Sequence, residues 1–123
     1  MKTAIRQVED LNVFQRSYSI SLTLHEISLR FPKHEQYHGV GDQIRRASKG
    51  ICANLAEGFG KQHISTAEFK RYLSMAIGSA DETRLWLSYA RDLNYLEEQI
   101  ADNYRNEYQE IAKMLSGLHK SWK

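Results

Sequence analysis

Residues 43–60, QIRRASKGICANLAEGFG, carry the pattern that most restricts the fold of this chain. Small or apolar side chains recur there every three or four residues, which places them on one side of an α-helix: Ile44, Ala47, Ser48, Ile51, Cys52, Leu55, Ala56 and Phe59. That side must be buried against other elements. The cations Arg45, Arg46 and Lys49 are predicted to lie on the opposite, hydrated side. We therefore expect a packed helix with a basic outer surface.

Similar stripes recur along the rest of the chain, and few residues interrupt them. Only one proline and seven glycines occur among 123 residues, too few for the many turns of a β architecture. The stripes predict four helices, at about residues 11–31, 41–59, 66–93 and 97–122. Short turns between helices of similar length make neighbouring helices antiparallel. We expect an all-α, antiparallel up-down four-helix bundle, and residues 1–123 as a single domain, because such a length closes one core.

Local signals mark several helix ends. Asp10 is a suitable N-cap for the first helix. Ser65 and Glu68 have the spacing of a capping box at the start of the third helix. Gly58 and Gly60 are predicted to end the second helix, because glycine readily adopts the positive φ found at helix ends.

Two segments of the second helix also resemble a known family. QIRRA followed by ANLAEGFG is similar to the pattern of the bacterial 23S rRNA intervening-sequence proteins, which are small four-helix-bundle proteins. The resemblance implies a ring-shaped homopentamer of four-helix bundles. A related group, the accessory proteins of diversity-generating retroelements, uses similar basic rings to hold nucleic acid and a reverse transcriptase. The likeness extends from about Leu11 to Trp122 and includes Phe31-Pro32-Lys33, Glu68-Phe69, Tyr72-Leu73, Asp92-Leu93 and Tyr95.

The distribution of charge indicates where nucleic acid could bind. The net charge is only +2, but residues 1–80 carry +4 and residues 81–123 carry −2. A weakly basic subunit binds phosphates firmly only when several copies act together. In a ring of subunits, the cations of each copy would form a continuous basic surface around the ring. The candidate contacts to RNA or DNA are Arg45, Arg46, Lys49, Lys61, Lys70 and Arg71.

The alternative for these cations is a solvated face with local ion pairs. Asp42 lies four residues before Arg46, and Glu57 lies four residues before Lys61. Such pairs stabilise an exposed helix by only about 0.2–0.5 kcal/mol each.

Large side chains displaced from the main stripe of the third helix predict a subunit interface. A monomer would leave some of them in water, although they could instead flank the core under neighbouring helices. They are Tyr72, Met75, Trp86 and Tyr89.

Four residues of the second helix are predicted to have structural roles. Gly50 allows another backbone to come close, which would offset the cost of about 1 kcal/mol for a glycine inside a helix. Asn54, Glu57 and Gly58 belong to the segment that resembles the family, and their polar groups are placed to hydrogen-bond the start of the next helix.

No constellation of residues predicts catalysis, a cofactor or a metal. Glu57 has no second acid, metal cluster or nucleophile beside it in the pattern. Glu35 and His38 have the Glu-x-x-His spacing of di-iron bundles, but those bundles need two such motifs. Ribonucleases of the HEPN type have an arginine followed by a histidine after four to six residues. Here three residues separate Arg30 from His34, and seven separate it from His38. We expect a protein that is not an enzyme.

The remaining expectations concern location and partners. No apolar run has the length of a signal segment or a membrane span, and the single Cys52 cannot form an internal disulfide. We expect a cytoplasmic protein without membrane contact. The expected function is the binding of RNA or DNA by a homo-oligomer, with a protein partner as a further possibility. The alternative is a protein-binding scaffold or accessory subunit without direct nucleic-acid contact, which would use the aromatic face of the third helix.

Overall fold

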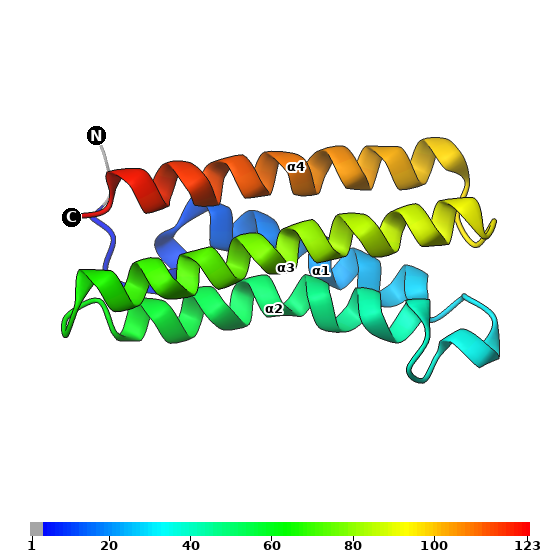
Figure 1. Cartoon of the computed structure of the whole chain (residues 1–123), viewed down its shortest axis with the longest axis horizontal. Coiled ribbons are helices and arrows are strands. Elements are labelled where there is room, and N and C mark those ends of the chain that lie inside the picture. Colours follow the sequence, from blue (N-terminus) through cyan, green and yellow to red (C-terminus); the bar gives the residue numbers. More distant parts are fainter. Residues whose placement is uncertain (1–3) are drawn as a thin grey trace.

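The computed structural model describes residues 4–123, and among these residues it contains four long helices and no strand. The helices are α1 (Asn12–Ser28), α2 (Val40–Gly60), α3 (Thr66–Asp92) and α4 (Glu98–Ser121). Two short 3-10 turns, η1 (Val8–Asp10) and η2 (Lys33–Glu35), precede α1 and α2. Successive helices run in opposite directions, so α1 begins at the end of the bundle where α4 finishes (Figure 1). The prediction of an all-α four-helix bundle is confirmed.

Three helices agree with their predicted limits to within one residue, but α1 ends earlier than predicted, at Ser28. The amide of Phe31 donates to the Ser28 carbonyl at 3.2 Å, which closes a tight turn directly before Pro32. Proline disfavours helical geometry in the residue before it, so the turn replaces the last part of the expected helix. The Phe31 ring then packs on Tyr95, with 5.5 Å between the ring centroids, and covers this end of the bundle.

Asp10 does not cap α1, contrary to the sequence prediction. Its carboxylate accepts hydrogen bonds from the amides of Arg6 and Gln7, at 2.9 and 3.1 Å. These bonds lower the pKa of the Asp10 carboxyl below its ordinary value. The N-cap position of α1 is occupied by Leu11, whose side chain makes no capping hydrogen bond.

Ser65 caps α3 as expected, because its hydroxyl accepts a hydrogen bond from the Glu68 amide at 3.3 Å. In a full capping box the Glu68 carboxylate would also accept a hydrogen bond from the Ser65 amide. Here the Glu68 carboxylate instead forms an ion pair with Arg71 at 2.9 Å. After the other end of α3, Asn94 adopts a positive φ of 65°. Asparagine tolerates this left-handed conformation, which turns the chain into α4.

The apolar stripes of the four helices meet in one core. Aromatic rings of α2, α3 and the C-terminal residues close one end of it, where Phe69 lies edge-on to Trp122 with 4.8 Å between the centroids. The largest core side chains are at most 1% exposed: Leu24, Ile44, Ile51, Leu55, Phe69, Leu73, Leu87, Tyr108, Ile111 and Leu115.

The four helices do not pack equally. Helix α2 packs along α3 and α3 packs along α4, whereas α1 packs mainly on α2 and contacts α4 sparsely. An ion pair bridges the open groove between α1 and α4, in which Arg16 donates through Nε and through Nη2 to the Glu107 carboxylate, the latter at 3.1 Å. In the described part of the chain, no helix combines the length and the apolar character needed to cross a membrane.

Candidate nucleic-acid interface

Arg45 is turned into the subunit instead of toward solvent. Its guanidinium donates to the Ser28 hydroxyl at 2.9 Å and to the Gln36 carbonyl at 2.7 Å, and the side chain is half-buried. These bonds join α2 to the end of α1 and to the segment before α2. The prediction that Arg45 lies on the hydrated side of its helix is therefore wrong, because the position borders α1 and the loop supplies acceptors for it.

Arg46 and Lys49 do lie on the outer side of α2. The Arg46 side chain is 69% exposed and donates to the Asp42 carboxylate at 3.0 Å. The Lys49 ammonium lies 2.9 Å from Nδ1 of His25 in α1, a contact in which the ammonium can act only as the donor. Both cations are held by weak surface contacts and can still reach a phosphate.

Lys61 and Arg71 converge on one aromatic ring at the turn between α2 and α3. The Lys61 ammonium lies 5.9 Å and the Arg71 guanidinium 4.7 Å from the centre of the Tyr72 ring. Arg71 also donates to Glu68, and this hydrogen bond raises the pKa of Arg71. Lys70 is half-buried and is rotated by about 100° around α3 from Arg71, so it belongs to a different face.

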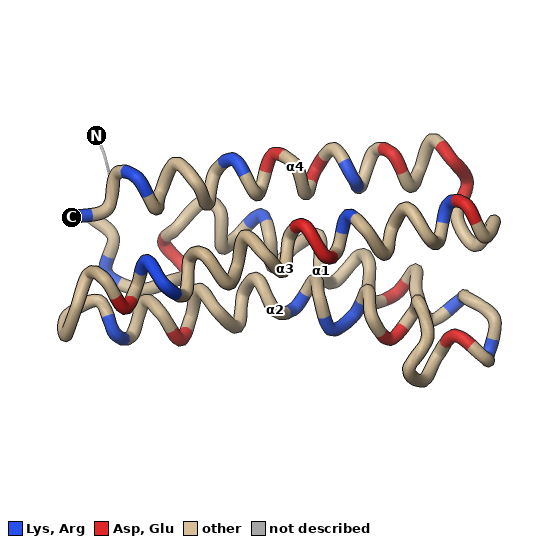
Figure 2. The backbone as a smooth tube through the Cα atoms, in the orientation of Figure 1, with Lys and Arg blue, Asp and Glu red and all other residues tan. Residues whose placement is uncertain are grey.

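The six predicted cations therefore do not form one site. Figure 2 shows two separate basic groups on the α2–α3 pair, one near the middle of α2 and one at the turn. About 18 Å of helix separates Lys49 from Lys61, at 1.5 Å per residue. The exposed Glu57 lies between the two groups along α2. An extended ligand could contact both groups, whereas a single phosphate could contact only one.

Tyr72 is not available for the predicted subunit interface. It is 8% exposed, and its hydroxyl donates to the Glu57 carboxylate at 3.2 Å. The position looks displaced from the core stripe of α3, but it faces α2, where Gly58 leaves room for the ring. Tyr72 therefore does not belong to the subunit interface that the sequence predicted.

The other predicted interface residues lie on the outer side of α3, Met75 about 16 Å of helix before the contacting pair Trp86 and Tyr89. Met75 and Tyr89 are 44% and 49% exposed, and Trp86 is half-buried. The Trp86 and Tyr89 rings pack with 5.4 Å between centroids, and the indole nitrogen donates to Glu82 at 3.3 Å. Leu85, which is 52% exposed, adds to the apolar surface on this side of α3 but was not evident from the sequence.

Gly58 allows α2 and α3 to approach closely, and it does not end α2. Neither Gly58 nor Gly60 has a positive φ, and α2 continues through Gly60. A Cβ atom on Gly58 would lie 2.4 Å from the Cβ of Tyr72. The prediction that Gly58 ends α2 is wrong, because a tertiary contact requires glycine at this position. α2 does end at Gly60, but without the positive φ that was expected.

The other motif residues support the same helix pair. A Cβ atom on Gly50 would lie 2.9 Å from the Ser79 hydroxyl oxygen of α3. Glu57 accepts from Tyr72 of α3 at 3.2 Å, as predicted, whereas the Asn54 side-chain amide donates to the Gly50 carbonyl of its own helix at 2.9 Å and not to the next helix. Gly50, Glu57 and Gly58 therefore make the contact between α2 and α3.

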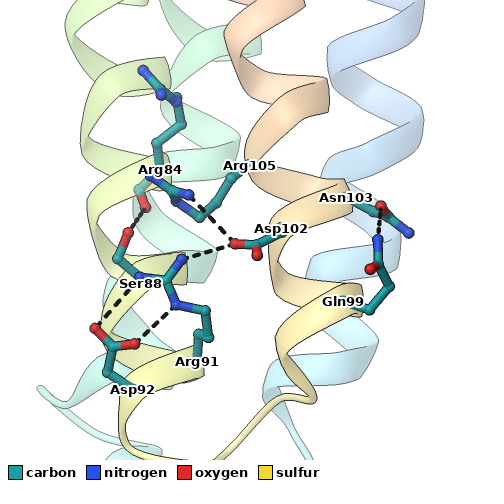
Figure 3. A network of polar contacts seen from close by, with 8 residues as sticks. All are labelled: Arg84, Ser88, Arg91, Asp92, Gln99, Asp102, Asn103 and Arg105. Atoms are coloured by element: carbon teal, nitrogen blue, oxygen red, sulfur yellow. Dashed lines mark hydrogen bonds and ion pairs between the residues drawn. The ribbon is translucent and has the colours of Figure 1, made fainter.

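A third group of charges lies at the seam between α3 and α4 and was not apparent from the sequence (Figure 3). Arg91 donates to Asp92 at 2.8 Å and to Asp102 at 2.8 Å. These carboxylates raise the pKa of Arg91, and Arg91 lowers the pKa of Asp92. Arg84 and Arg105 lie beside this pair. The only sequence feature that could have indicated this charged group is that positions 84, 88 and 91 share one face of α3.

Other reactive groups are dispersed. Among residues 4–123, no three His, Cys, Asp or Glu side chains come together in a way that could hold a metal ion. Burial raises the pKa of the Cys52 thiol to about 11. The thiol is therefore protonated at neutral pH and is a poor nucleophile.

A family model described as 23S rRNA-intervening sequence protein matches residues 9–117. The chain belongs to this family. The matched range includes the Gly58 motif, both outer basic groups and the α3–α4 seam.

A solved structure shows the fold of a related protein. It is the crystal structure of a protein of unknown function from the S23 ribosomal protein family of Bacteroides thetaiotaomicron VPI-5482. The two chains are 25% identical and superpose with a TM-score of 0.79, over 89% of this chain and 99% of the other. No curated protein matches the chain. The four-helix fold of this chain is thus shared with a crystallised protein of the S23 ribosomal protein family.

Proposed function

We propose that this protein is a non-enzymatic, homo-oligomeric RNA-binding bundle of the cytoplasm. The observation that carries the proposal is the pair of basic groups, Arg46 with Lys49 on the outer side of α2 and Lys61 with Arg71 at the turn between α2 and α3. Their spacing of about 18 Å along α2 suits an extended strand that meets the two groups with phosphates several nucleotides apart. The family description, which refers to 23S rRNA, favours RNA over DNA as the ligand.

Self-association is part of the proposal because one subunit offers few phosphate contacts. The net charge of one chain is +2, and the affinity for nucleic acid rises with the number of phosphates that are neutralised. The patch of Met75, Leu85, Trp86 and Tyr89 is the apolar surface on α3 that we assign to the contact between subunits. The resemblance described above implies five copies.

The experiment that tests RNA binding measures the affinity of the protein for a single-stranded RNA at several salt concentrations. For single strands, each neutralised phosphate contributes about 0.7 to the slope of log affinity against log salt. We expect the double variant Arg46→Ala with Lys49→Ala to reduce the slope by roughly 1.4 per pair of lost contacts. The variant Lys61→Ala with Arg71→Ala should have an effect of similar size.

The matched control is Arg30→Ala with Lys33→Ala. Both side chains are exposed and lie in the segment between α1 and α2, so the control removes the same charge without touching either basic group. The proposal predicts that the control leaves the slope unchanged. Equal slopes in all variants, or a salt-independent affinity in the unmodified protein, would contradict it.

The same material separates the alternatives. RNA that remains intact after incubation supports the absence of nuclease activity, and cleavage by purified protein contradicts it. Light scattering of a Met75→Glu variant with Tyr89→Glu tests the assigned subunit contact, because two buried charges should dissociate the oligomer. A protein that forms oligomers but binds no RNA at low salt would favour the protein-binding scaffold.

A further inference from the structure

The loop between α1 and α2 presents an aromatic side chain that neither the core nor the basic groups explain. Tyr37 is 84% exposed, more than any other tyrosine of residues 4–123. The loop projects beyond the first turn of α2 (Figure 1). A single aromatic ring on a surface is ordinary where the chain around it can move. The loop that carries Tyr37 is instead held from both sides, so the fold itself keeps this ring in solvent.

The chain before Tyr37 is tied to α1 and to α2. The side-chain amide of Gln36 donates to the carbonyls of Ser28 and Phe31, at 3.1 and 2.7 Å. The carbonyl of Gln36 accepts from the Arg45 guanidinium at 2.7 Å. This carbonyl belongs to the peptide group that links Gln36 to Tyr37. Arg45 therefore fixes the backbone directly before the exposed ring.

The chain after Tyr37 is held just as closely. His38 has a positive φ of 64°, a left-handed conformation that is uncommon in residues other than glycine. The Glu35 carboxylate accepts from the Val40 amide at 3.2 Å, and a Cβ atom on Gly39 would lie 2.6 Å from the Glu35 Cα atom. Positions 35 and 39 are therefore in contact, and the loop doubles back between them with Tyr37 at its tip.

The loop adjoins the end of α2 toward which the Arg46 side chain points. Arg46 directly follows Arg45, whose guanidinium contacts the peptide group before Tyr37. Nε of Arg46 donates at 3.0 Å to Asp42, which lies in the first turn of α2. This bond directs the Arg46 guanidinium toward the loop. An RNA strand that contacts Arg46 and continues past the start of α2 therefore reaches Tyr37.

We propose that Tyr37 stacks on one base of a single-stranded RNA that lies along α2, an inference that rests on the proposed RNA-binding function. Proteins bind single strands by combining cations that contact the backbone with aromatic side chains that stack on the bases. Tyrosine suits this role because only two side-chain torsions are ordered on binding. A loop that is already held in one conformation lowers the entropic cost further.

Stacking has a signature that separates it from the basic groups. Affinity that comes from phosphate contacts falls as salt rises, because each contact releases counterions. A stacked base neutralises no phosphate. Tyr37 should therefore add to the affinity for RNA without adding to the salt dependence of that affinity.

The test compares two ten-nucleotide ligands of equal charge, an adenosine RNA and an abasic ribose-phosphate strand that lacks the bases, on the full-length protein. Tyr37→Ala should weaken binding of the adenosine RNA by about 5- to 150-fold, the range for the loss of one stacked base. Binding of the abasic strand and the slope of log affinity against log salt should not change. In the unmodified protein, the NMR signals of the Tyr37 ring should shift upfield with the adenosine RNA and not with the abasic strand.

Two more substitutions at the same position separate stacking from other uses of the side chain. Tyr37→Phe keeps the aromatic face and should retain the affinity of the unmodified protein. Tyr37→Leu keeps apolar surface without an aromatic face and should weaken RNA binding nearly as much as Tyr37→Ala. Leu29→Ala is the matched control, because Leu29 is an exposed apolar side chain at the same end of the bundle that has no aromatic face. It should leave binding unchanged.

Four results would overturn the inference. The first is an unchanged affinity of Tyr37→Ala for the adenosine RNA, which would leave a protein partner as the use of the ring. The second is an equal loss for the abasic strand, and the third is full RNA binding by Tyr37→Leu. The fourth is a lower mass of Tyr37→Ala in light scattering, which would place the ring in a contact between subunits.

The same data distinguish this inference from the proposed function. Salt-dependent binding of both strands that Tyr37→Ala leaves unaltered would keep the proposed function and remove the stacking site alone. An unmodified protein that binds neither strand at low salt would contradict the proposed function itself, and the stacking site with it.

Discussion

The contact between α2 and α3 makes Gly58 the most informative position for a stability test. A Cβ atom on Gly58 would lie 2.4 Å from Cβ and 3.0 Å from Cγ of Tyr72, and 3.2 Å from a ring carbon of Phe69. The nearest of these atoms is attached directly to the backbone of α3. It cannot move aside by a change of rotamer, so Gly58→Ala must push the two helices apart.

The size of the effect follows from two opposing contributions. Replacing glycine by alanine inside a helix stabilises it by about 1 kcal/mol. Overpacking a close contact costs about 1–3 kcal/mol, and the upper part of this range applies when backbone must shift. We expect Gly58→Ala to lower the free energy of unfolding by about 1–2 kcal/mol.

Gly117→Ala is the matched control, because a Cβ atom on Gly117 meets no atom within 4 Å. It should raise the free energy of unfolding by about 0.5–1 kcal/mol. The two variants, measured by urea denaturation and circular dichroism at one protein concentration, should differ by about 1.5–3 kcal/mol in the free energy of unfolding, or roughly 10 °C in melting temperature.

A double variant gives a sharper test of the same reasoning. Tyr72→Ala removes the ring but keeps the Cβ atom that lies closest to Gly58, so it should not rescue Gly58→Ala completely. The reasoning is refuted if Gly58→Ala proves as stable as Gly117→Ala, since the helices would then tolerate the added carbon without separating.

Two further predictions concern α4. Glu107→Gln removes the ion pair with Arg16, which bridges α1 and α4; Arg16 lowers the pKa of the Glu107 carboxyl below its ordinary value of 4.5. A carboxyl with a depressed pKa stabilises the fold above its unfolded pKa and loses this contribution as the pH falls through its folded pKa. In urea denaturation at pH 7, the free energy of unfolding of the unmodified protein should therefore exceed that of the variant by about 0.5–1 kcal/mol. This difference should disappear below about pH 4.5. A difference that grows in acid would contradict a stabilising ion pair between Arg16 and Glu107. Tyr108→Phe removes a fully buried hydroxyl that has no hydrogen-bond partner among residues 4–123, so it should leave the free energy of unfolding unchanged or raise it; a loss above about 1 kcal/mol would show that the hydroxyl is paired in solution.

The elements of the fold could be predicted because their signals are local. The stripe from Ile44 to Phe59 and the Ser65 cap both lie within a few turns of helix, and the structure contains both features. Pro32 also acts locally, although its effect reaches back further than expected and ends α1 at Ser28. Such patterns depend on hydrogen bonds and side-chain spacing inside one segment, which the sequence displays directly.

The candidate sites could be predicted only in part, because side chains at the borders of a stripe depend on the neighbouring helix. Arg46 and Lys49 lie near the centre of the outer side of α2 and face solvent as expected. Arg45 and Tyr72 lie at the borders of their stripes, and each turns toward an adjacent element that supplies a hydrogen-bond acceptor. A helical repeat alone does not show which border faces solvent.

The sequence by itself determined four amphipathic helices, their order and a chain that closes into a bundle, because periodic burial and turn residues act over short distances. Only the tertiary structure decided that Gly58 lies at a helix contact, that Arg45 hydrogen-bonds inside the subunit and that Arg91 of α3 pairs with Asp102 of α4. These facts depend on the rotation and distance of one helix relative to another. That geometry arises from packing the whole core, which no single segment encodes.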